Sequence, residues 1–132
     1  MNKKLIFCIS VVFITGFLSA QTLTIRVENI EIEKGNLMIG IFSDEENFPD
    51  NYFRGESIPT SYSVLIIRFE NLPFGQYSVS VYQDANNNGK LDTNIFGIPT
   101  ERYGFSNDIR RPDFRRSMFD FNGDMTITIR IR

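Results

Sequence analysis

Residues 65–81, LIIRFENLPFGQYSVSV, contain two segments of alternating apolar residues and the turn that separates them. A period of two places one face of a strand against a core and the opposite face in water. In the turn, Pro73 fixes one backbone angle and Gly75 is free to adopt a positive φ. The stretch therefore predicts two β-strands, one on each side of residues 71–75. The alternating apolar residues are Leu65, Ile67, Phe69, Tyr77, Val79 and Val81.

The same alternation recurs in three other segments of the chain, residues 23–28, 37–42 and 125–132. None of them shows the period of about 3.6 residues that marks a long amphipathic helix. Residues 33–36, EKGN, have the composition of a hairpin turn and are predicted to join the first two strands. Short strands separated by such turns predict an all-β protein, a small antiparallel β-sandwich of about seven strands.

Two stretches interrupt this alternation. Residues 44–63 are expected to form an irregular crossover between the sheets. Residues 84–116 are long for a loop in a small domain, and loops of this length are usually either functional or disordered. Apolar side chains within this second stretch predict that it packs as an ordered insert. They are Phe96, Ile98, Tyr103 and Phe105.

The composition excludes several classes of chemistry. The chain has 132 residues, of which 42% are hydrophobic and 23% charged, and this is the balance and length of one globular domain. It has no His, so neither a Ser-His-Asp triad nor a Cys-His nucleophile can be assembled. Because Cys8 is the single cysteine, a disulfide scaffold and a Cys/His zinc site are excluded as well.

Residues 1–20 have the three parts of a secretory signal peptide. Two lysines precede an apolar run at residues 5–18, and Ser19 and Ala20 end it. We therefore expect cleavage after Ala20 and export to the periplasm, the cell surface or the medium. An uncleaved membrane anchor is the alternative. Cys8 lies inside the apolar run, which argues against a lipid-modified N-terminus.

The mature chain, residues 21–132, is acidic. Loss of Lys3 and Lys4 reduces fourteen basic residues to twelve against sixteen acidic ones, and the net charge changes from −2 to −4. This charge argues against nucleic acid as a partner, because phosphate binding needs a net basic surface. No later apolar run is long enough to span a bilayer as a helix.

The segment Asp84–Asp92, DANNNGKLD, matches the first nine positions of a calcium-binding loop. Calcium prefers about six to eight oxygen ligands. The glycine at position 6, here Gly89, permits the sharp turn that brings these ligands together. The ligands predicted from the spacing are the side chains of Asp84, Asn86, Asn88 and Asp92 and the carbonyl of Lys90.

The match ends before position 12, where an EF-hand has Glu and this chain has Ile95. Strands flank the loop, so an EF-hand is excluded and further oxygens must come from elsewhere. Asn94 and Glu101 are the nearest candidates, and Glu101 is the preferred distal carboxylate. Only two matched side chains are charged, which predicts a dissociation constant of about 10⁻⁴ to 10⁻³ M. The alternative is a turn that local side-chain bonds stabilise without a metal.

The residues that follow this loop form a second candidate region. Two pairs of adjacent arginines there, at residues 110–111 and 115–116, fit a phosphate, a sulfated glycan or an anionic lipid headgroup. The alternative is a solvated face on which Asp108 and Asp113 offset the basic charge. The predicted ligand or partner surface consists of Tyr103, Ser106, Asn107, Arg110 and Arg111.

Residues 69–107 resemble a bacterial family called domain of unknown function 2141 (DUF2141), and the likeness extends over nearly the whole mature chain. The motifs that carry it are LPFGQY at 72–77, DANNNGKLD at 84–92 and FGIPTERYGFSN at 96–107. Gln83 departs from the family pattern, in which His commonly precedes the loop Asp. The resemblance implies a Greek-key β-sandwich of the transthyretin-like or carboxypeptidase-regulatory-like kind. It implies no established activity.

Together these observations predict an exported, non-catalytic β-sandwich. Its Asp84–Asp92 loop is expected to hold calcium and to order the insert as a recognition surface for a protein or a glycan. Two alternatives stay open. One is a small hydrolase that uses the carboxylates of Asp84, Asp92 or Glu101, as glycosidases use paired carboxylates. The other is a purely structural module with a metal-free loop.

Overall fold

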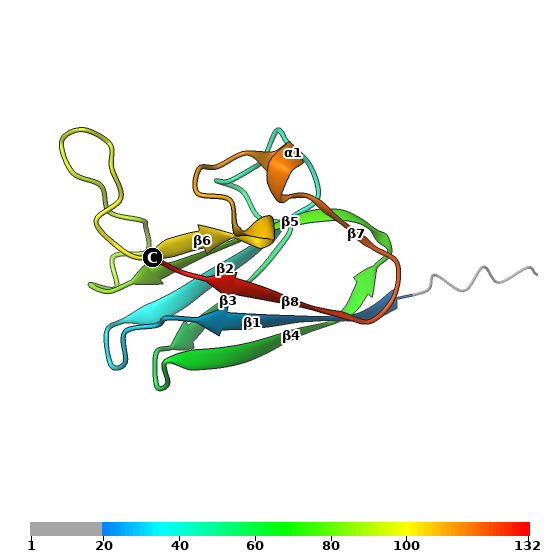
Figure 1. The fold of residues 1–132 in the computed structure, drawn as a ribbon, viewed down its shortest axis with the longest axis horizontal. Coiled ribbons are helices and arrows are strands. Elements are labelled where there is room, and N and C mark those ends of the chain that lie inside the picture. The colour runs from blue at the N-terminus through cyan, green and yellow to red at the C-terminus, as the bar shows by residue number, and fades with distance from the viewer. Residues whose placement is uncertain (1–19) are drawn as a thin grey trace, which may run out of the picture.

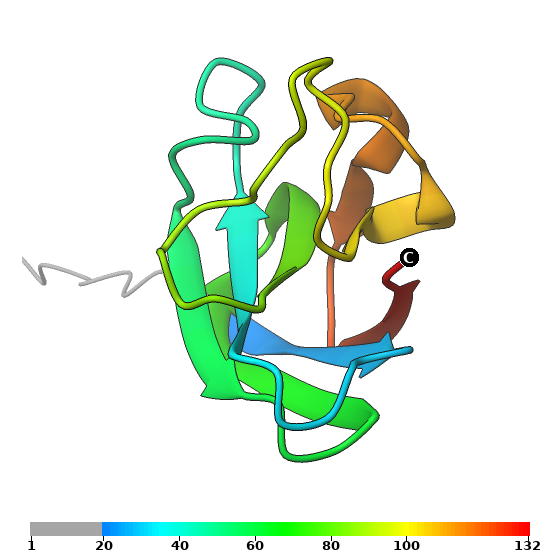
Figure 2. The same cartoon turned by 90° about the vertical axis from the view of Figure 1, so that its left-hand side faces the viewer.

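Two β-sheets pack face to face in the computed structural model, which describes residues 20–132 (Figures 1 and 2). The first sheet has three strands in the order β4-β1-β8. The second has the order β3-β2-β5-β6, and β7 pairs with β5 as well. The predicted all-β sandwich is confirmed. The strands are β1 (Ala20–Glu28), β2 (Asn36–Phe42), β3 (Arg54–Pro59), β4 (Val64–Pro73), β5 (Gly75–Asp84), β6 (Tyr103–Phe105), β7 (Phe119–Phe121) and β8 (Met125–Arg130).

The space between the sheets is filled by residues that the alternation assigns to the inner faces. Leu23, Ile25 and Val27 of β1 are fully buried. Removing such side chains from water is the main favourable contribution to the free energy of folding. The corresponding buried residues of the other strands are Leu37, Ile39, Ile41, Ile67, Phe69, Tyr77, Val79, Val81 and Ile129.

The strand pairing differs from the sequence prediction in three respects. β1 and β2 belong to different sheets, so residues 33–36 cross between the sheets and the predicted hairpin is wrong. β8 runs parallel to β1, with Met125 opposite Leu23, so the sandwich is not antiparallel throughout. Residues 44–63, predicted to be irregular, contain β3, which makes eight strands among the described residues. Alternation identifies the buried face of a strand but carries no information about its partner.

A second apolar cluster lies on the outer face of the second sheet. Phe48, from the β2–β3 connection, contacts the rings of Phe42, Phe105 and Phe114, with ring centroids 5.1, 5.7 and 5.9 Å apart. Phe114 belongs to α1 (Phe114–Ser117), which follows the short helix η1 (Ser106–Asp108). The cluster therefore fixes several connecting segments on this face. Figure 2 shows these segments rising on the side away from the first sheet.

The insert is ordered, but two of its apolar residues do not pack. Phe105 is buried, whereas Ile98 is exposed and Phe96 is 80% exposed. The side-chain oxygen of Asn94 accepts hydrogen bonds from the backbone N–H groups of Phe96 and Ile98, at 2.9 and 3.1 Å. This turn holds both side chains outward on the loop that projects from the body in Figure 1. The predicted packing of Phe96 and Ile98 is therefore wrong.

Residues 1–19, which make up nearly all of the predicted signal peptide, lie outside the described residues. β1 begins at Ala20, the residue after which cleavage is predicted. Within residues 20–132, no helix is long and apolar enough to cross a membrane.

The connection from β1 to β2 passes closely over the end of β5. Gln83 is buried there, and its side-chain oxygen accepts the N–H of Glu31 at 2.9 Å. Its amide nitrogen donates to the carbonyls of Glu31 and Lys34 at 2.6 and 2.8 Å. Gly35 has a φ of 63°, and a Cβ on it would lie 1.8 Å from the carbonyl oxygen of Asp84. Glycine is required at this crossing, because any side chain would strain the backbone and clash with β5.

Replacement of this glycine tests the crossing. We expect Gly35→Ala to lower the free energy of unfolding by at least about 2 kcal/mol, from the positive φ and the clash together. The measurement is urea denaturation followed by circular dichroism. Gly123→Ala is the matched control, because a Cβ at Gly123 meets nothing within 4 Å, and we expect a change within about 0.5 kcal/mol. Equal effects of the two substitutions would contradict this account.

Candidate functional site

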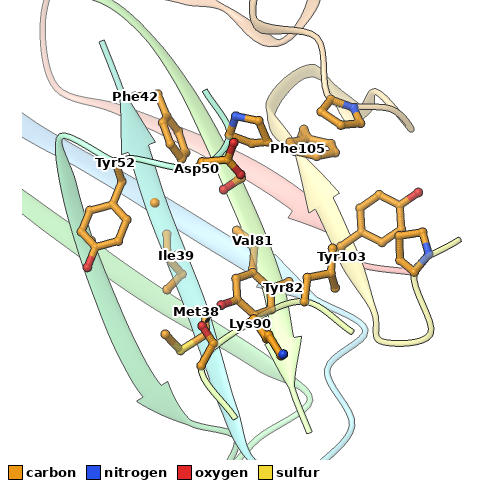
Figure 3. Close-up of a pocket in the computed structure, with 18 of the residues that line it drawn as sticks. Met38, Ile39, Phe42, Asp50, Tyr52, Val81, Tyr82, Lys90, Tyr103 and Phe105 are labelled. Atoms are coloured by element: carbon orange, nitrogen blue, oxygen red, sulfur yellow. Dashed lines mark hydrogen bonds between the residues drawn. The ribbon is translucent and has the colours of Figure 1, made fainter. Parts of the chain in front are cut away.

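A groove of about 1020 Å³ lies over the outer face of the second sheet. Its floor consists of residues that point away from the core, and connecting segments form its walls. The β2–β3 connection lies on one side, and the insert and the residues after β6 lie on the other. Figure 3 shows aromatic side chains around it. Lining residues include Met38, Gly40, Tyr52, Gly55, Ser80, Tyr82, Tyr103 and Phe105.

Charged residues also line the groove. Lys90, Arg110 and Arg111 are exposed and form no ion pair with any residue of 20–132. Asp50 comes from the β2–β3 connection, and Glu56 belongs to β3. The arginines follow β6 in the chain. Glu56 pairs with Ile39, whose side chain enters the core, so the side chain of Glu56 points to the face of β3 away from the groove. The groove therefore offers three cations that have no ion-pair partner among residues 20–132, together with the carboxylate of Asp50.

The Asp84–Asp92 loop forms part of the groove wall and is held by its own side chains. Asp84 is only 3% exposed, and its two carboxylate oxygens accept the backbone N–H groups of Asn88 and Gly89 at 3.1 and 2.7 Å. The side-chain oxygen of Asn86 accepts the N–H of Asn88, and that of Asn88 accepts the N–H of Lys90. Side chains at positions 1, 3 and 5 of the loop therefore each turn inward onto the backbone that follows them.

Asp92 closes the loop from the opposite side. Its two carboxylate oxygens accept the side-chain amides of Asn86 and Asn88, at 2.5 and 2.7 Å. The hydrogen bond from Asn88, followed by that from Asn86, lowers the pKa of Asp92 below its ordinary value of 3.8. Both bonds stabilise the ionised form of the carboxyl. Asp92 is therefore a carboxylate at neutral pH, held between two amides.

Glu101 lies beside the loop but binds its backbone. One carboxylate oxygen accepts the N–H of Ala85 at 2.9 Å, and the other accepts the N–H of Asp92 at 3.0 Å. These two bonds join the beginning and the end of the loop. The structure thus brings together four predicted ligand side chains, those of Asp84, Asn86, Asn88 and Asp92, and places Glu101 as a clamp on the backbone. Within the described part of the chain, no three His, Cys, Asp or Glu side chains gather where they could hold a metal ion.

The predicted partner surface divides into two groups. Tyr103, Arg110 and Arg111 line the groove. Ser106 does not, because it is buried, accepts the N–H of Val79 at 3.0 Å and donates to the carbonyl of Ser117 at 2.6 Å. Asn107 donates to the carbonyls of Arg116 and Met118. Ser106 and Asn107 therefore hold η1 against α1, and their positions do not fit the predicted ligand surface.

The comparisons with known proteins agree with the resemblance that the motifs suggest. A family model described as an uncharacterized protein conserved in bacteria, DUF2141, matches residues 25–129. The chain belongs to this family. No curated protein and no solved structure matches it. The likeness to transthyretin therefore stays an expectation, and the DUF2141 match supplies no activity, partner or cofactor.

The residues that form the floor of the groove were not predicted from the sequence. Met38, Gly40 and Tyr82 occupy the outward positions of strands whose inward positions were recognised. Tyr52 lies in the stretch that was predicted to be an irregular crossover. The available signal was the presence of apolar and aromatic residues at positions that alternation assigns to water.

Titration of Asp92 tests the side-chain network of the loop. Because its pKa is lowered, the bonds to Asn86 and Asn88 contribute at neutral pH and are lost as the pH falls through the lowered pKa. We expect the Asp92 carboxyl, followed by carbon NMR, to titrate below 3.8. Asn88→Ala should raise that midpoint, and Asn122→Ala, in the β7–β8 turn, should leave it unchanged. A midpoint at the ordinary value in the unsubstituted protein would show that the network does not form.

Proposed function

We propose that this DUF2141 domain is an exported, non-catalytic binding module that holds its partner in the groove over the second sheet. The observation that carries the proposal is the groove itself. It is open along the sheet, and connecting segments form its walls. Aromatic side chains line it, as do cations that form no ion pair within the described part of the chain. Concave surfaces with apolar linings and a few polar groups are the usual places for ligand binding. Export is supported by the composition of residues 1–20.

The hydrolase alternative has less support. Glycosidases need one carboxyl that stays protonated to act as an acid and a second that acts as nucleophile or base. The pKa of Asp92 is lowered, which is the wrong direction for an acid. Asp84 and Glu101 each use both oxygens to hold backbone N–H groups of the loop. The three carboxylates are therefore better explained by loop structure than by proton transfer.

Calcium binding to the Asp84–Asp92 loop is a second part of the proposal. Its support is that four oxygen-bearing side chains at the spacing of a calcium loop converge in the fold. The loop already satisfies these oxygens with N–H donors, so an ion must displace the amide contacts of Asn86 and Asn88 with Asp92. This competition accords with weak binding, and the bound ion would hold the groove wall more rigidly.

Thermal unfolding with and without calcium tests the ion. At about 10 mM calcium, the expected affinity adds roughly 1.4 to 2.7 kcal/mol, which raises the melting temperature by several degrees relative to chelator. Asp92→Asn should remove the rise. Asp120→Asn, on β7, makes the same change of charge away from the loop and should keep it. No rise, or an equal rise with magnesium, would favour the metal-free turn.

The groove is tested by nitrogen–proton NMR with a panel of uronic acid oligosaccharides, neutral oligosaccharides and unstructured peptides. We expect at least one probe class to shift the amide signals of groove residues such as Gly40, Tyr82 and Tyr103. Ser80→Trp, which fills the floor, should abolish those shifts. Thr126→Trp, on the outer face of the first sheet, should leave them intact. Shifts confined to the first sheet, or none with any class, would contradict a binding role for the groove.

A further inference from the structure

Tyr52 packs against two glycines in adjacent strands. Gly40 of β2 and Gly55 of β3 are direct cross-strand partners. A Cβ at Gly55 would lie 2.8 and 2.9 Å from two ring carbons of Tyr52, and a Cβ at Gly40 would lie 3.1 Å from its Cβ. Because neither glycine has a side chain, the tyrosine can lie close to the sheet. Figure 3 shows Tyr52 beside β2 at one side of the groove.

This arrangement leaves the tyrosine available to a ligand. Although one side of it contacts the glycine pair, Tyr52 is 61% exposed and lines the groove. Glycine within a strand weakens the strand, and a pair of glycines opposite each other does so twice. An aromatic ring over glycine restores part of that loss. The result is an aromatic ring that packs against the sheet on one side and is exposed to the groove on the other.

The polar groups of the groove narrow the class of ligand. Planar guanidinium groups bind carboxylates through paired hydrogen bonds, and Arg110 and Arg111 are without an ion-pair partner in residues 20–132. The backbone carbonyl of Arg110 accepts the hydroxyl of Tyr103 at 2.9 Å, which fixes the first arginine beside β6. Asp50, which lies between Phe42 and Phe105 in Figure 3, is an acceptor that suits hydroxyl groups.

We propose that the groove binds an acidic polysaccharide, with a sugar ring stacked on Tyr52 and uronic acid carboxylates facing Arg110 and Arg111. The C–H groups on the face of a pyranose carry partial positive charge and match the negative face of an aromatic ring. Hydroxyl groups of the same chain meet Asp50. This inference rests on the proposed binding role of the groove and names its ligand.

Two other polymers fit the groove less well. An extended peptide commonly binds by adding a strand to a free sheet edge, whereas this groove lies across the face of a sheet. The exposed edge strand β3 carries Arg54, Glu56 and Pro59, which oppose strand addition. A nucleic acid would also stack on tyrosine, but its phosphodiester backbone offers few hydroxyl groups to the acceptor Asp50, whereas each sugar ring of a polysaccharide carries several.

Calorimetric titration of the purified protein with oligogalacturonate tests the inference, with neutral cello-oligosaccharide as the comparison probe. We expect oligogalacturonate to bind more tightly, with an affinity that falls as salt is raised. Tyr52→Ala should weaken binding about tenfold or more, while Tyr62→Ala, an exposed tyrosine before β4, should not. The double substitution Arg110→Ala with Arg111→Ala should weaken binding similarly, and Arg68→Ala on the first sheet should not.

Two further variants separate stacking from stability. Tyr52→Phe keeps the ring face and should bind nearly as the original protein does. Tyr52→Leu covers the glycine pair without a ring and should bind as poorly as Tyr52→Ala. The inference is overturned if oligogalacturonate, alginate and hyaluronan fragments all fail to bind, or if the neutral probe binds equally well. Peptides that shift the groove amides while these sugars do not would overturn the ligand class and leave the binding role of the groove standing.

Discussion

Two adjacent polar side chains at the end of β5, Gln83 and Asp84, are buried and fully hydrogen-bonded. A buried polar group without partners is costly, so the backbone around each of them has to be placed where it can donate or accept. Gln83 holds the crossover from β1 to β2 on one side of the strand. Asp84 holds the polar loop on the other. These two residues thus determine how the chain crosses between the sheets and where the groove wall lies. Both contacts depend on Gly35, because a side chain there would clash with the backbone of Asp84.

The sequence contained enough information for the strands and for the core, because period-two alternation reports burial directly. Leu23, Ile39 and Val79 were assigned to the interior from that pattern and are buried there. The pairing of the strands could not be predicted from this pattern, because it depends on contacts between residues that are distant in the chain. Residues 33–36 have the composition of a hairpin turn, yet they cross between sheets, because β1 pairs with β4 and β8 instead. Nothing local distinguishes a turn that returns along the same sheet from one that passes to the opposite sheet.

The candidate site was predictable where its residues are close in sequence. The Asp84–Asp92 spacing identified four side chains that converge, whereas Glu101 was assigned to an ion and instead binds the backbone of the loop. The groove was not predicted because its residues come from many segments that are separate in the sequence. The position of its aromatic residue Tyr52 depends on Gly40 and Gly55, which become neighbours only through the register of β2 and β3. From the sequence alone, a serine that faces a ligand cannot be distinguished from one that donates to a buried carbonyl, as Ser106 does.

The position of β1 between β4 and β8 determines when the domain can fold. Thr22 and Asp124, which are hydrogen-bonded across this sheet, are 102 residues apart in the chain. While the protein is being synthesised, the middle strand of the first sheet therefore waits for a neighbour that lies about a hundred residues further along the chain. Long-range pairings of this kind form slowly. One edge of β1 therefore stays unpaired, and the first sheet incomplete, until β8 has been synthesised.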